Sequence, residues 1–249
     1  MQVAQRLSRR IKRHRDQREL YGKPCYVAAY PYWMIHDRLG WGPLGKYIAL
    51  ARRIPSWTRG EEAVALAQCS DALPGSPLIV EIGSFLGCST VLLAGARRLR
   101  GAGRVHCVDP FDASGEAFSA PIYHAVGQSL GRSLREKFDQ NIRGAGLADW
   151  VEVHQDRAVE AAMGWTRPID LLFLDGDQSY EGVQLAYRSW SPFLKADGFI
   201  AVHNSRSGTY AAGHDGHRRL VEETIRLPWY AEVHCIGTTT FARKLGDAE

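Results

Sequence analysis

The sequence predicts an α/β fold, with one doubly wound, mainly parallel sheet that carries helices on both of its faces. Two observations lead to this prediction. Short apolar runs typical of buried parallel strands alternate with helical patterns, and each run ends in acidic, polar or glycine residues. The 249 residues are 45% hydrophobic and 23% charged, which suffices for one substantial core, and no repeat or linker divides them.

The first predicted strand, residues 78–82, contains Glu81 and is followed by Gly83 and Gly87. Glycine lets a backbone turn sharply and pass close to a ligand, and the apolar residues over 91–99 predict a helix whose amino end points at that ligand. A dinucleotide-binding loop is excluded, because its G-x-G-x-x-G pattern requires glycine where Phe85 stands. An ordinary glycine turn is the alternative.

The next two predicted strands also end near acids. Residues 104–108 lead to Asp109, whose carboxylate could accept hydrogen bonds from both hydroxyls of a ribose, or could cap the following turn. Residues 150–154 lead to Asp156, which could accept from an adenine amino group or act as the N-cap of a helix that starts near residue 159.

Two further predicted strands place polar groups at the same edge of the sheet. Residues 169–174 run into Asp175 and Asp177, and residues 199–202 are followed by His203 and Asn204. Because open α/β sheets bind ligands at the carboxyl ends of their strands, these side chains and the Gly83 loop are predicted to border one site.

Two segments carry a resemblance to known families. The E-x-G-x-x-x-G pattern from Glu81 to Gly87 resembles motif I of the class I S-adenosylmethionine-dependent methyltransferases. The segment 175–182, DGDQSYEG, resembles the D-G-D-H-S-Y-E-G segment of the macrocin O-methyltransferase-like family, which methylates hydroxyls and is distantly related to catechol O-methyltransferase. The similarity covers about residues 77–205. It implies a Rossmann-like sheet of about seven strands whose last strand runs antiparallel, with 230–236 and 238–242 as the closing hairpin.

The resemblance also implies a cofactor, S-adenosylmethionine. We expect its contacts to come from the residues of the motif and from the acids after the second and third strands, namely Glu81, Gly83, Ser84, Gly87, Asp109 and Asp156.

Metal-dependent relatives hold a divalent cation, usually Mg²⁺, with an acid after strand four and an adjacent pair after strand five. The matching positions are Asp175, His203 and Asn204. Oxygen ligands suit Mg²⁺ or Mn²⁺, whereas His203 stands where those relatives often carry an acid. In the alternative interpretation, His203 and Asn204 bind the substrate by hydrogen bonds or cap the strand.

Methyl transfer requires an acceptor oxygen held in line with the S–methyl bond, and a group that removes the hydroxyl proton. Asp177 matches a position that supplies the base in some sugar-methylating relatives and is our first candidate, with His203 second. His214 and His217 in a glycine-rich segment are further candidates. Gln178 stands where the family often has histidine, and it cannot act as a base.

We expect residues 1–75 to form a helical extension and residues 76–249 to form the cofactor-binding domain. The first 23 residues hold eight basic and two acidic side chains, which favours a solvated helix over contact with RNA, lipid or an acidic partner. Aromatic residues and helices near 44–53 and 61–73 follow, and we expect them to form a lid or the contacts of a homodimer. A second variable segment, 112–131, predicts a mobile flap over the site.

The predicted function is methyl transfer to a small-molecule hydroxyl, on a sugar or another natural product, by a cytoplasmic enzyme. Five cysteines without C-x-x-C spacing favour a reducing compartment, and no apolar run has the length of a membrane span or of a signal core. Two alternatives stay open. An RNA methyltransferase would use the basic arm, although the N-P-P or D-P-P typical of base-methylating enzymes is absent after strand four. A non-catalytic cofactor-binding protein would explain the departures at Gln178 and His203.

Overall fold

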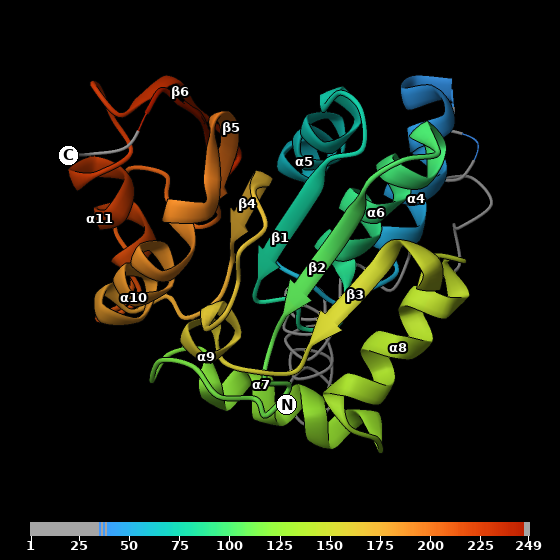
Figure 1. The fold of residues 1–249 in the computed structure, drawn as a ribbon. Helices are drawn as coiled ribbons and strands as arrows, with labels where there is room; N and C mark the ends of the chain where they lie inside the picture. Colours follow the sequence, from blue (N-terminus) through green and yellow to red (C-terminus); the bar gives the residue numbers. More distant parts are fainter. Residues whose placement is uncertain (1–34, 36, 38, 247–249) are drawn as a thin grey trace, which may run out of the picture.

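A seven-stranded sheet forms the middle layer of the protein, and helices pack on both of its faces (Figure 1). The computed structural model describes residues 35, 37 and 39–246. The predictions for the basic segment 1–23 and for the aromatic residues before residue 35 therefore lie outside the described residues.

The strand order is β3-β2-β1-β4-β5-β7-β6. Strands β1 to β5 run parallel to one another, and β7 pairs antiparallel with both β5 and β6. The predicted doubly wound sheet with an antiparallel end is thus confirmed, and its order reverses between β1 and β4. The strands are β1 (Leu78–Ile82), β2 (Arg104–Val108), β3 (Val151–His154), β4 (Ile169–Leu174), β5 (Leu194–Val202), β6 (Tyr230–Ile236) and β7 (Thr239–Lys244).

Two hydrophobic clusters, one on each face of the sheet, form the core. Alternate residues of a strand point to opposite faces, so Ile79 joins one cluster and Val80 the other. Helices α4 (Gly45–Ala51), α5 (Gly60–Ala72), α6 (Cys88–Arg100) and α8 (Leu134–Gly144) contribute to the first cluster, and α9 (Ala158–Ala162), α10 (Tyr180–Trp190) and α11 (Gly216–Glu223) to the second.

The described part of the N-terminal extension shares the main core. Tyr47 and Ile48 of α4 and Leu66 of α5 are about 1% exposed and belong to the same cluster as Ile79 of β1. The short helices η1 (Gly42–Leu44), η2 (Ala148–Trp150) and η3 (Ser191–Phe193) complete the fold. Among the described residues, no helix has both the length and the apolar character needed to cross a membrane.

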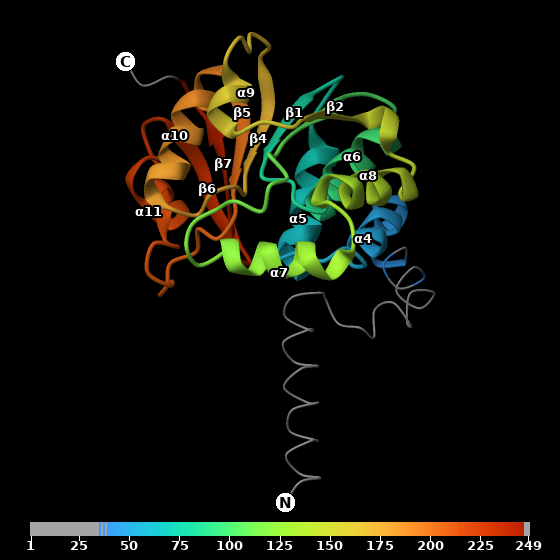
Figure 2. The same cartoon turned by 90° about the horizontal axis from the view of Figure 1, so that it is seen from below.

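The segment 112–131, predicted to be a mobile flap over the site, is partly helical. Its second half forms α7 (Ala120–Leu130), with Pro121 in the first turn, where a missing N–H does no harm. The arrowheads of β1, β2 and β3 point toward the side where α7 lies (Figure 1), and the second view shows α7 crossing that side of the molecule (Figure 2). The helix thus lies at the carboxyl edge of the sheet, where its Tyr123 borders a cavity. The mobility of the segment stays a prediction.

Candidate active site

A cavity of about 570 Å³ opens at the carboxyl ends of β1, β2 and β4. This is the edge at which the sequence predicts a site, and the volume lies within the usual range for small-molecule pockets. Residues from the loops after these strands, from the 112–116 segment and from α7 form its wall. They include Gly83, Phe85, Asp109, Glu116, Tyr123, Asp175 and Asp177.

The loop after β1 depends on Gly83. Its φ is +86°, and a Cβ at this position would lie 2.4 Å from the carbonyl oxygen of Asp175. No side chain fits there, because real Cβ atoms do not approach backbone oxygens so closely. Gly87, with φ +87°, is the N-cap residue of α6. Gly83 therefore brings the loop after β1 against the backbone that follows β4 at the cavity, whereas Gly87 faces the side chains of Phe138 and Ile142 and is not part of the cavity wall.

Asp109 borders the cavity as predicted, but its carboxylate mainly holds backbone. It accepts hydrogen bonds from the N–H groups of Ser84 at 2.9 Å, Phe85 at 2.8 Å and Phe111 at 2.7 Å. Phe85 is held with φ 47°, which is uncommon for a residue other than glycine. A carboxylate offers about four acceptor directions, so roughly one is left for a ribose hydroxyl. The ribose contact stays a prediction.

Glu81 lies beneath the loop and Ser84 within it, and neither is part of the cavity wall, so their contacts with the cofactor stay predictions. Glu81 is fully buried, and it accepts hydrogen bonds from the hydroxyls of Ser84 and Thr90. Burial raises the pKa of this carboxyl above its usual range. Glu81 thus supports the loop from below.

The structure also revises both predicted roles of Asp156. Its side chain is exposed and is not part of the cavity wall, and Arg157 rather than Asp156 is the N-cap residue of α9. Strand β3 ends at His154, and the chain turns before Asp156, so the acid faces solvent. The wall on this side comes from the first residues of α9, Ala158 to Glu160.

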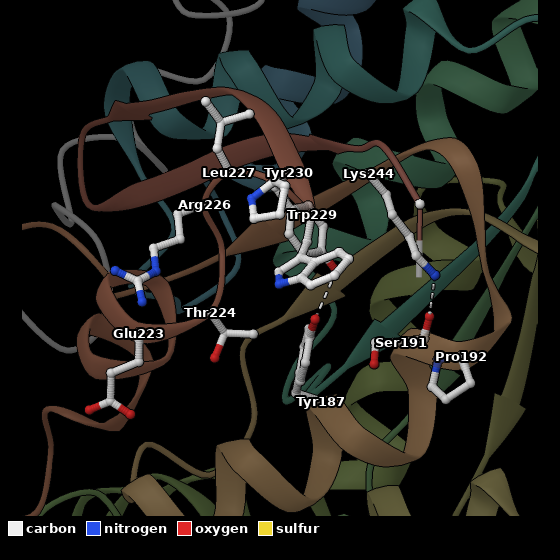
Figure 3. Close-up of a pocket in the computed structure, with 12 residues that line it drawn as sticks. Tyr187, Ser191, Pro192, Glu223, Thr224, Arg226, Leu227, Trp229, Tyr230 and Lys244 are labelled. Atoms are coloured by element: carbon white, nitrogen blue, oxygen red, sulfur yellow. Dashed lines mark hydrogen bonds between the residues drawn. The ribbon is translucent and has the colours of Figure 1, made fainter. Parts of the chain in front are cut away.

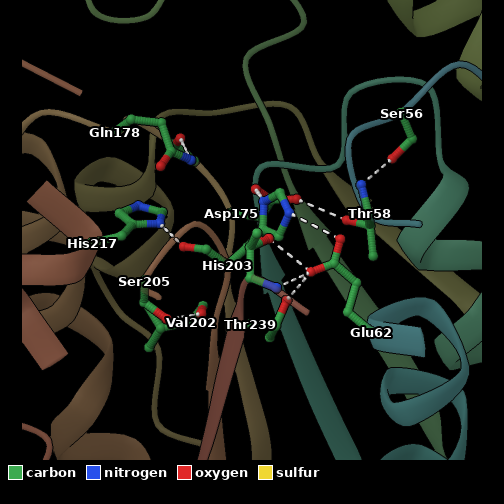
Figure 4. Close-up of polar contacts among 12 residues, drawn as sticks. Ser56, Thr58, Glu62, Asp175, Gln178, Val202, His203, Ser205, His217 and Thr239 are labelled. Carbon is green, nitrogen blue, oxygen red and sulfur yellow. Dashed lines mark hydrogen bonds and ion pairs between the residues drawn. The ribbon is translucent and has the colours of Figure 1, made fainter. Parts of the chain in front are cut away.

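On the other side of the cavity, Asp175 is paired with a buried histidine (Figure 4). His203 Nδ1 lies 2.6 Å from Asp175 Oδ1, and His203 Nε2 lies 3.7 Å from Glu62 Oε1. Burial alone would lower the pKa of His203, but the charges and hydrogen bonds of Asp175 and Glu62 outweigh it and raise the pKa to about 10. His203 is 1% exposed. A buried, protonated imidazole cannot take a proton from an acceptor, so this geometry does not support His203 as the base.

Glu62 is a site residue that sequence reasoning missed. Its Oε2 accepts from the N–H and the hydroxyl of Thr238, both at 2.7 Å, and its Oε1 accepts from the N–H of Arg59 at 3.1 Å. Burial would raise the pKa of Glu62, yet His203 and Thr238 together lower it to about 2. Glu62 occupies the N3 position of α5, where a glutamate is expected for capping alone, so the sequence carries no signal of this second role.

The predicted metal ligands Asp175, His203 and Asn204 do not fit a divalent cation as they stand. Neighbouring ligand atoms on Mg²⁺ lie about 2.9 Å apart, because each is 2.0–2.1 Å from the ion at right angles. The 2.6 Å between His203 and Asp175 is instead a direct hydrogen bond, and both ring nitrogens face carboxylates. Asn204 follows in a turn with φ 50°.

Asp177 keeps its place as the candidate base. It is exposed at the cavity, and its Oδ1 accepts from the N–H of Ser179 at 2.8 Å. This bond orients the carboxylate and leaves Oδ2 available to the hydroxyl group of a methyl acceptor. The neighbouring Gln178 is 2% exposed and donates to the carbonyl of Gly176, so it is part of the support of this loop.

The two further histidine candidates do not face the cavity as free bases. His217 is 1% exposed in α11, and its ring nitrogens lie near the carbonyl oxygens of His203 at 2.6 Å and Asp177 at 3.1 Å. His214 pairs with Glu116 at 2.8 Å. Both histidines thus hold loops around the site.

A second group of possible ligands lies elsewhere, on β2 and β3. His106, Glu152 and His154 come close enough together to surround an ion. However, Arg167 Nη1 lies 3.0 Å from His106 Nε2, and an arginine can only donate. His106 Nδ1 must then carry the proton that it donates to His154 Nε2, 2.9 Å away. The group forms a hydrogen-bonded chain rather than an open ligand set.

A second cavity, of about 470 Å³, lies between α10, α11 and the strands β6 and β7 (Figure 3). The hydroxyls of Tyr187 and Tyr230 are 3.0 Å apart in it, and Lys244 donates to the carbonyls of Ser191 and Leu194. These groups lie near the amino end of β5, opposite to the edge with the predicted site, and none of the predicted site residues borders this cavity.

Comparison with known proteins gives one family match and several similar structures. Residues 80–205 match the family model described as "Methyltransferase domain". The structure of cofactor-bound Rv0187 from MTB is 19% identical, with a TM-score of 0.56 over 93% of this chain and 94% of that chain. The O-methyltransferase NovP is 16% identical, with a TM-score of 0.56 over 79% and 86%. The SAH-bound Podospora anserina methyltransferase PaMTH1 is 13% identical, with a TM-score of 0.56 over 85% and 93%. At these identities the structures show a common fold.

Proposed function

Because this chain belongs to the methyltransferase domain family and is an S-adenosylmethionine-dependent methyltransferase, we propose that it transfers the methyl group to a hydroxyl of a small molecule. The acceptor class is a sugar or another natural-product hydroxyl, as the likeness of residues 175–182 to the macrocin O-methyltransferase-like family suggests. One observation carries the proposal. A single cavity is bordered by the Gly83 loop and Asp109 on one side and by Asp175 and Asp177 on the other.

The first side suits the cofactor. S-adenosylmethionine supplies a methyl group on a positively charged sulfur. Gly83 has no side chain to obstruct a ligand, and Asp109 holds the loop in place through the N–H groups of Ser84 and Phe85. A preformed loop of this kind binds without first being ordered, which favours affinity. The spare acceptor direction of Asp109 is available to a ribose hydroxyl.

The second side suits the acceptor. Asp177 is exposed at the cavity with one carboxylate oxygen unoccupied among the described contacts. A sugar hydroxyl is a weak acid, so it reacts well only when a base removes its proton as the new bond forms. Asp177 would take that proton, and Asp175 would orient the hydroxyl through its own oxygens. Positioning supplies the rest of the rate enhancement, because the acceptor oxygen must lie in line with the S–methyl bond.

The test is a transfer assay with a panel of hydroxyl acceptors, which includes glycosides, free sugars and catechols, together with S-adenosylmethionine. We expect formation of S-adenosylhomocysteine that depends on a hydroxyl acceptor, and a product that carries one more methyl group. Asp177→Asn should retain cofactor binding and lose about 100-fold in transfer rate, since general bases typically contribute this much. Asp112→Asn, at another exposed acid of the same cavity wall, is the matched control and should transfer normally.

Two results would contradict the proposal. Methylation of RNA bases, but of none of the hydroxyl acceptors, would favour the RNA methyltransferase alternative. Full activity of Asp177→Asn beside an impaired Asp112→Asn would remove Asp177 from the mechanism. The basic arm on which the RNA alternative depends lies outside the described residues.

A further inference from the structure

Three ionisable side chains from different elements meet beside the cavity. Glu62 comes from α5, Asp175 follows β4, and His203 follows β5 (Figure 4). Their side chains are only 7%, 19% and 1% exposed. Side chains this far removed from water retain their charges only when opposite charges compensate them.

The geometry of this group favours a positively charged partner for the two carboxylates. Two carboxylates lie within ion-pair distance of one imidazole, Asp175 at 2.6 Å from Nδ1 and Glu62 at 3.7 Å from Nε2. A neutral imidazole has one N–H, whereas its protonated form has two and can face both carboxylates as a donor. The protonated ring is therefore the form that matches its surroundings.

Glu62 is held rigidly in its place. Its Oε2 accepts from Thr238 at 2.7 Å and from the hydroxyl of Thr239 at 3.3 Å, in the turn between β6 and β7. A Cβ on Gly237 in the same turn would lie 2.9 Å from Oε2. Glu62 is thus a fixed buried anion behind the imidazole ring. Its negative charge favours a positive charge on the ring independently of Asp175.

The distance between His203 and Asp175 also argues against a bound ion. The ring reaches Asp175 directly, at hydrogen-bond distance, and leaves no gap that an ion could occupy between Nδ1 and Oδ1. The hydroxyl of Thr58, at 3.4 Å, approaches the second oxygen of Asp175. Asp175 therefore already has a positive partner, and that partner is part of the chain.

We propose that the side chain of His203, held between Glu62 and Asp175, occupies the place of the divalent cation used by metal-dependent relatives, so that this chain binds no metal ion at the site. His203 is then a positioning residue that acts through Asp175. The absence of metal binding does not depend on the proposed function, whereas the action of Asp175 on an acceptor hydroxyl rests on it.

The experiment measures binding of Mn²⁺ alone to metal-free protein by electron paramagnetic resonance, where bound Mn²⁺ loses the signal of the free ion. Wild type and Asp175→Asn are compared first, and we expect the same lack of saturable binding in both. His203→Asp is the second variant, because it places an acid next to Asn204 and removes the internal cation. We expect this variant to gain saturable Mn²⁺ binding, and the double variant His203→Asp with Asp175→Asn to lose it again. A merely structural role of His203 would not produce this gain.

The outcomes are distinct. Saturable Mn²⁺ binding to wild type that disappears in Asp175→Asn overturns the inference, as does a folded His203→Asp protein that binds none. If His203→Asp does not fold, the comparison of wild type with Asp175→Asn still decides whether the site binds Mn²⁺. Titration of S-adenosylhomocysteine into the same samples separates this inference from the proposed function, because lost cofactor binding would contradict the latter while the Mn²⁺ result stands by itself.

Discussion

The two sides of the cavity differ in whether backbone or side chains form them. The side predicted to hold the cofactor is made of backbone, with Gly83 against the chain of Asp175 and with N–H groups gathered on Asp109. The acceptor side depends on side chains, with Asp175 and Asp177 at the cavity and with His203 and Glu62 forming a buried group of charges behind Asp175. Backbone conformation follows from short local motifs, whereas a group of charges depends on which distant segments meet. Substitutions on the acceptor side should therefore lower stability, whereas substitutions on the cofactor side should lower cofactor affinity.

The largest effect is expected on the acceptor side, from His203→Ala. The change leaves Asp175 and Glu62 as buried carboxylates without a cation, and removing one partner of a buried ion pair typically lowers the free energy of unfolding by about 3 kcal/mol or more. Chemical denaturation would measure this. His234→Ala, at an exposed position of β6, is the control and should change stability by less than about 0.5 kcal/mol. Equal stability of the two variants would contradict the charge group.

On the cofactor side, Gly83→Ala should act on binding. Its Cβ would collide with the carbonyl oxygen of Asp175, so the loop must move away from β4, and we expect affinity for S-adenosylhomocysteine to fall about 100-fold, equivalent to about 2.7 kcal/mol. Gly101→Ala is matched in backbone conformation, with φ +69°, but nothing lies within 4 Å of its Cβ. Calorimetric titration should find the control unchanged. A similar loss in both variants would mean that backbone strain alone matters.

A smaller loss of affinity is expected for Asp109→Ala. The variant frees the N–H groups of Ser84, Phe85 and Phe111, each held at 2.9 Å or less, and relaxes the loop before the ligand arrives. An effect of about 2 kcal/mol, or roughly 30-fold in affinity, is expected from lost hydrogen bonds to a charged group. Asp149→Ala, at an exposed acid of η2, serves as the control in the same titration. Wild-type affinity in Asp109→Ala would argue against the cofactor side as described.

The smallest effect concerns the segment over the cavity and depends on pH. Burial would raise the pKa of Glu116, but hydrogen bonds from His214, Ser119 and the backbone outweigh it and lower the pKa to about 2 from the usual 4.5. The unfolded chain then binds more protons than the folded one between these values. The stabilisation by Glu116 is thus complete above about pH 4.5 and is lost as the pH falls toward 2.

Unfolding free energies of wild type and Glu116→Gln would test this pH dependence. The variant should be the less stable protein at neutral pH, and the difference should shrink as the solution is acidified below about pH 4.5. A difference that stays constant over this range would show that Glu116 is not ionised in the folded protein, and the paired His214 would then need another role.

The sequence predicted the sheet well because its signals are local. Strands β1, β2, β4 and β6 have their expected bounds. Gly83, Asp109 and Asp177 were likewise placed at the cavity, since each follows an apolar strand directly or by a few residues.

The sequence did not predict the direction in which a side chain points near the end of its strand. Glu81 lies before the turn and faces the core, and Asp156 lies two residues past its strand and faces solvent. Glu62 was missed because its partner Thr238 is 176 residues away, and only the packing of α5 beside the β6–β7 turn brings the two together. The environment of His203 depends on the same packing, because Glu62 adds to the effect of Asp175 in raising its pKa.

The most direct test of the central claim is a calorimetric titration of S-adenosylhomocysteine into the wild-type protein in a buffer with chelator. The account predicts saturable binding at one site per chain, unchanged when Mg²⁺ or Mn²⁺ replaces the chelator. A titration without any binding in either buffer would contradict the assignment of the cavity to the cofactor.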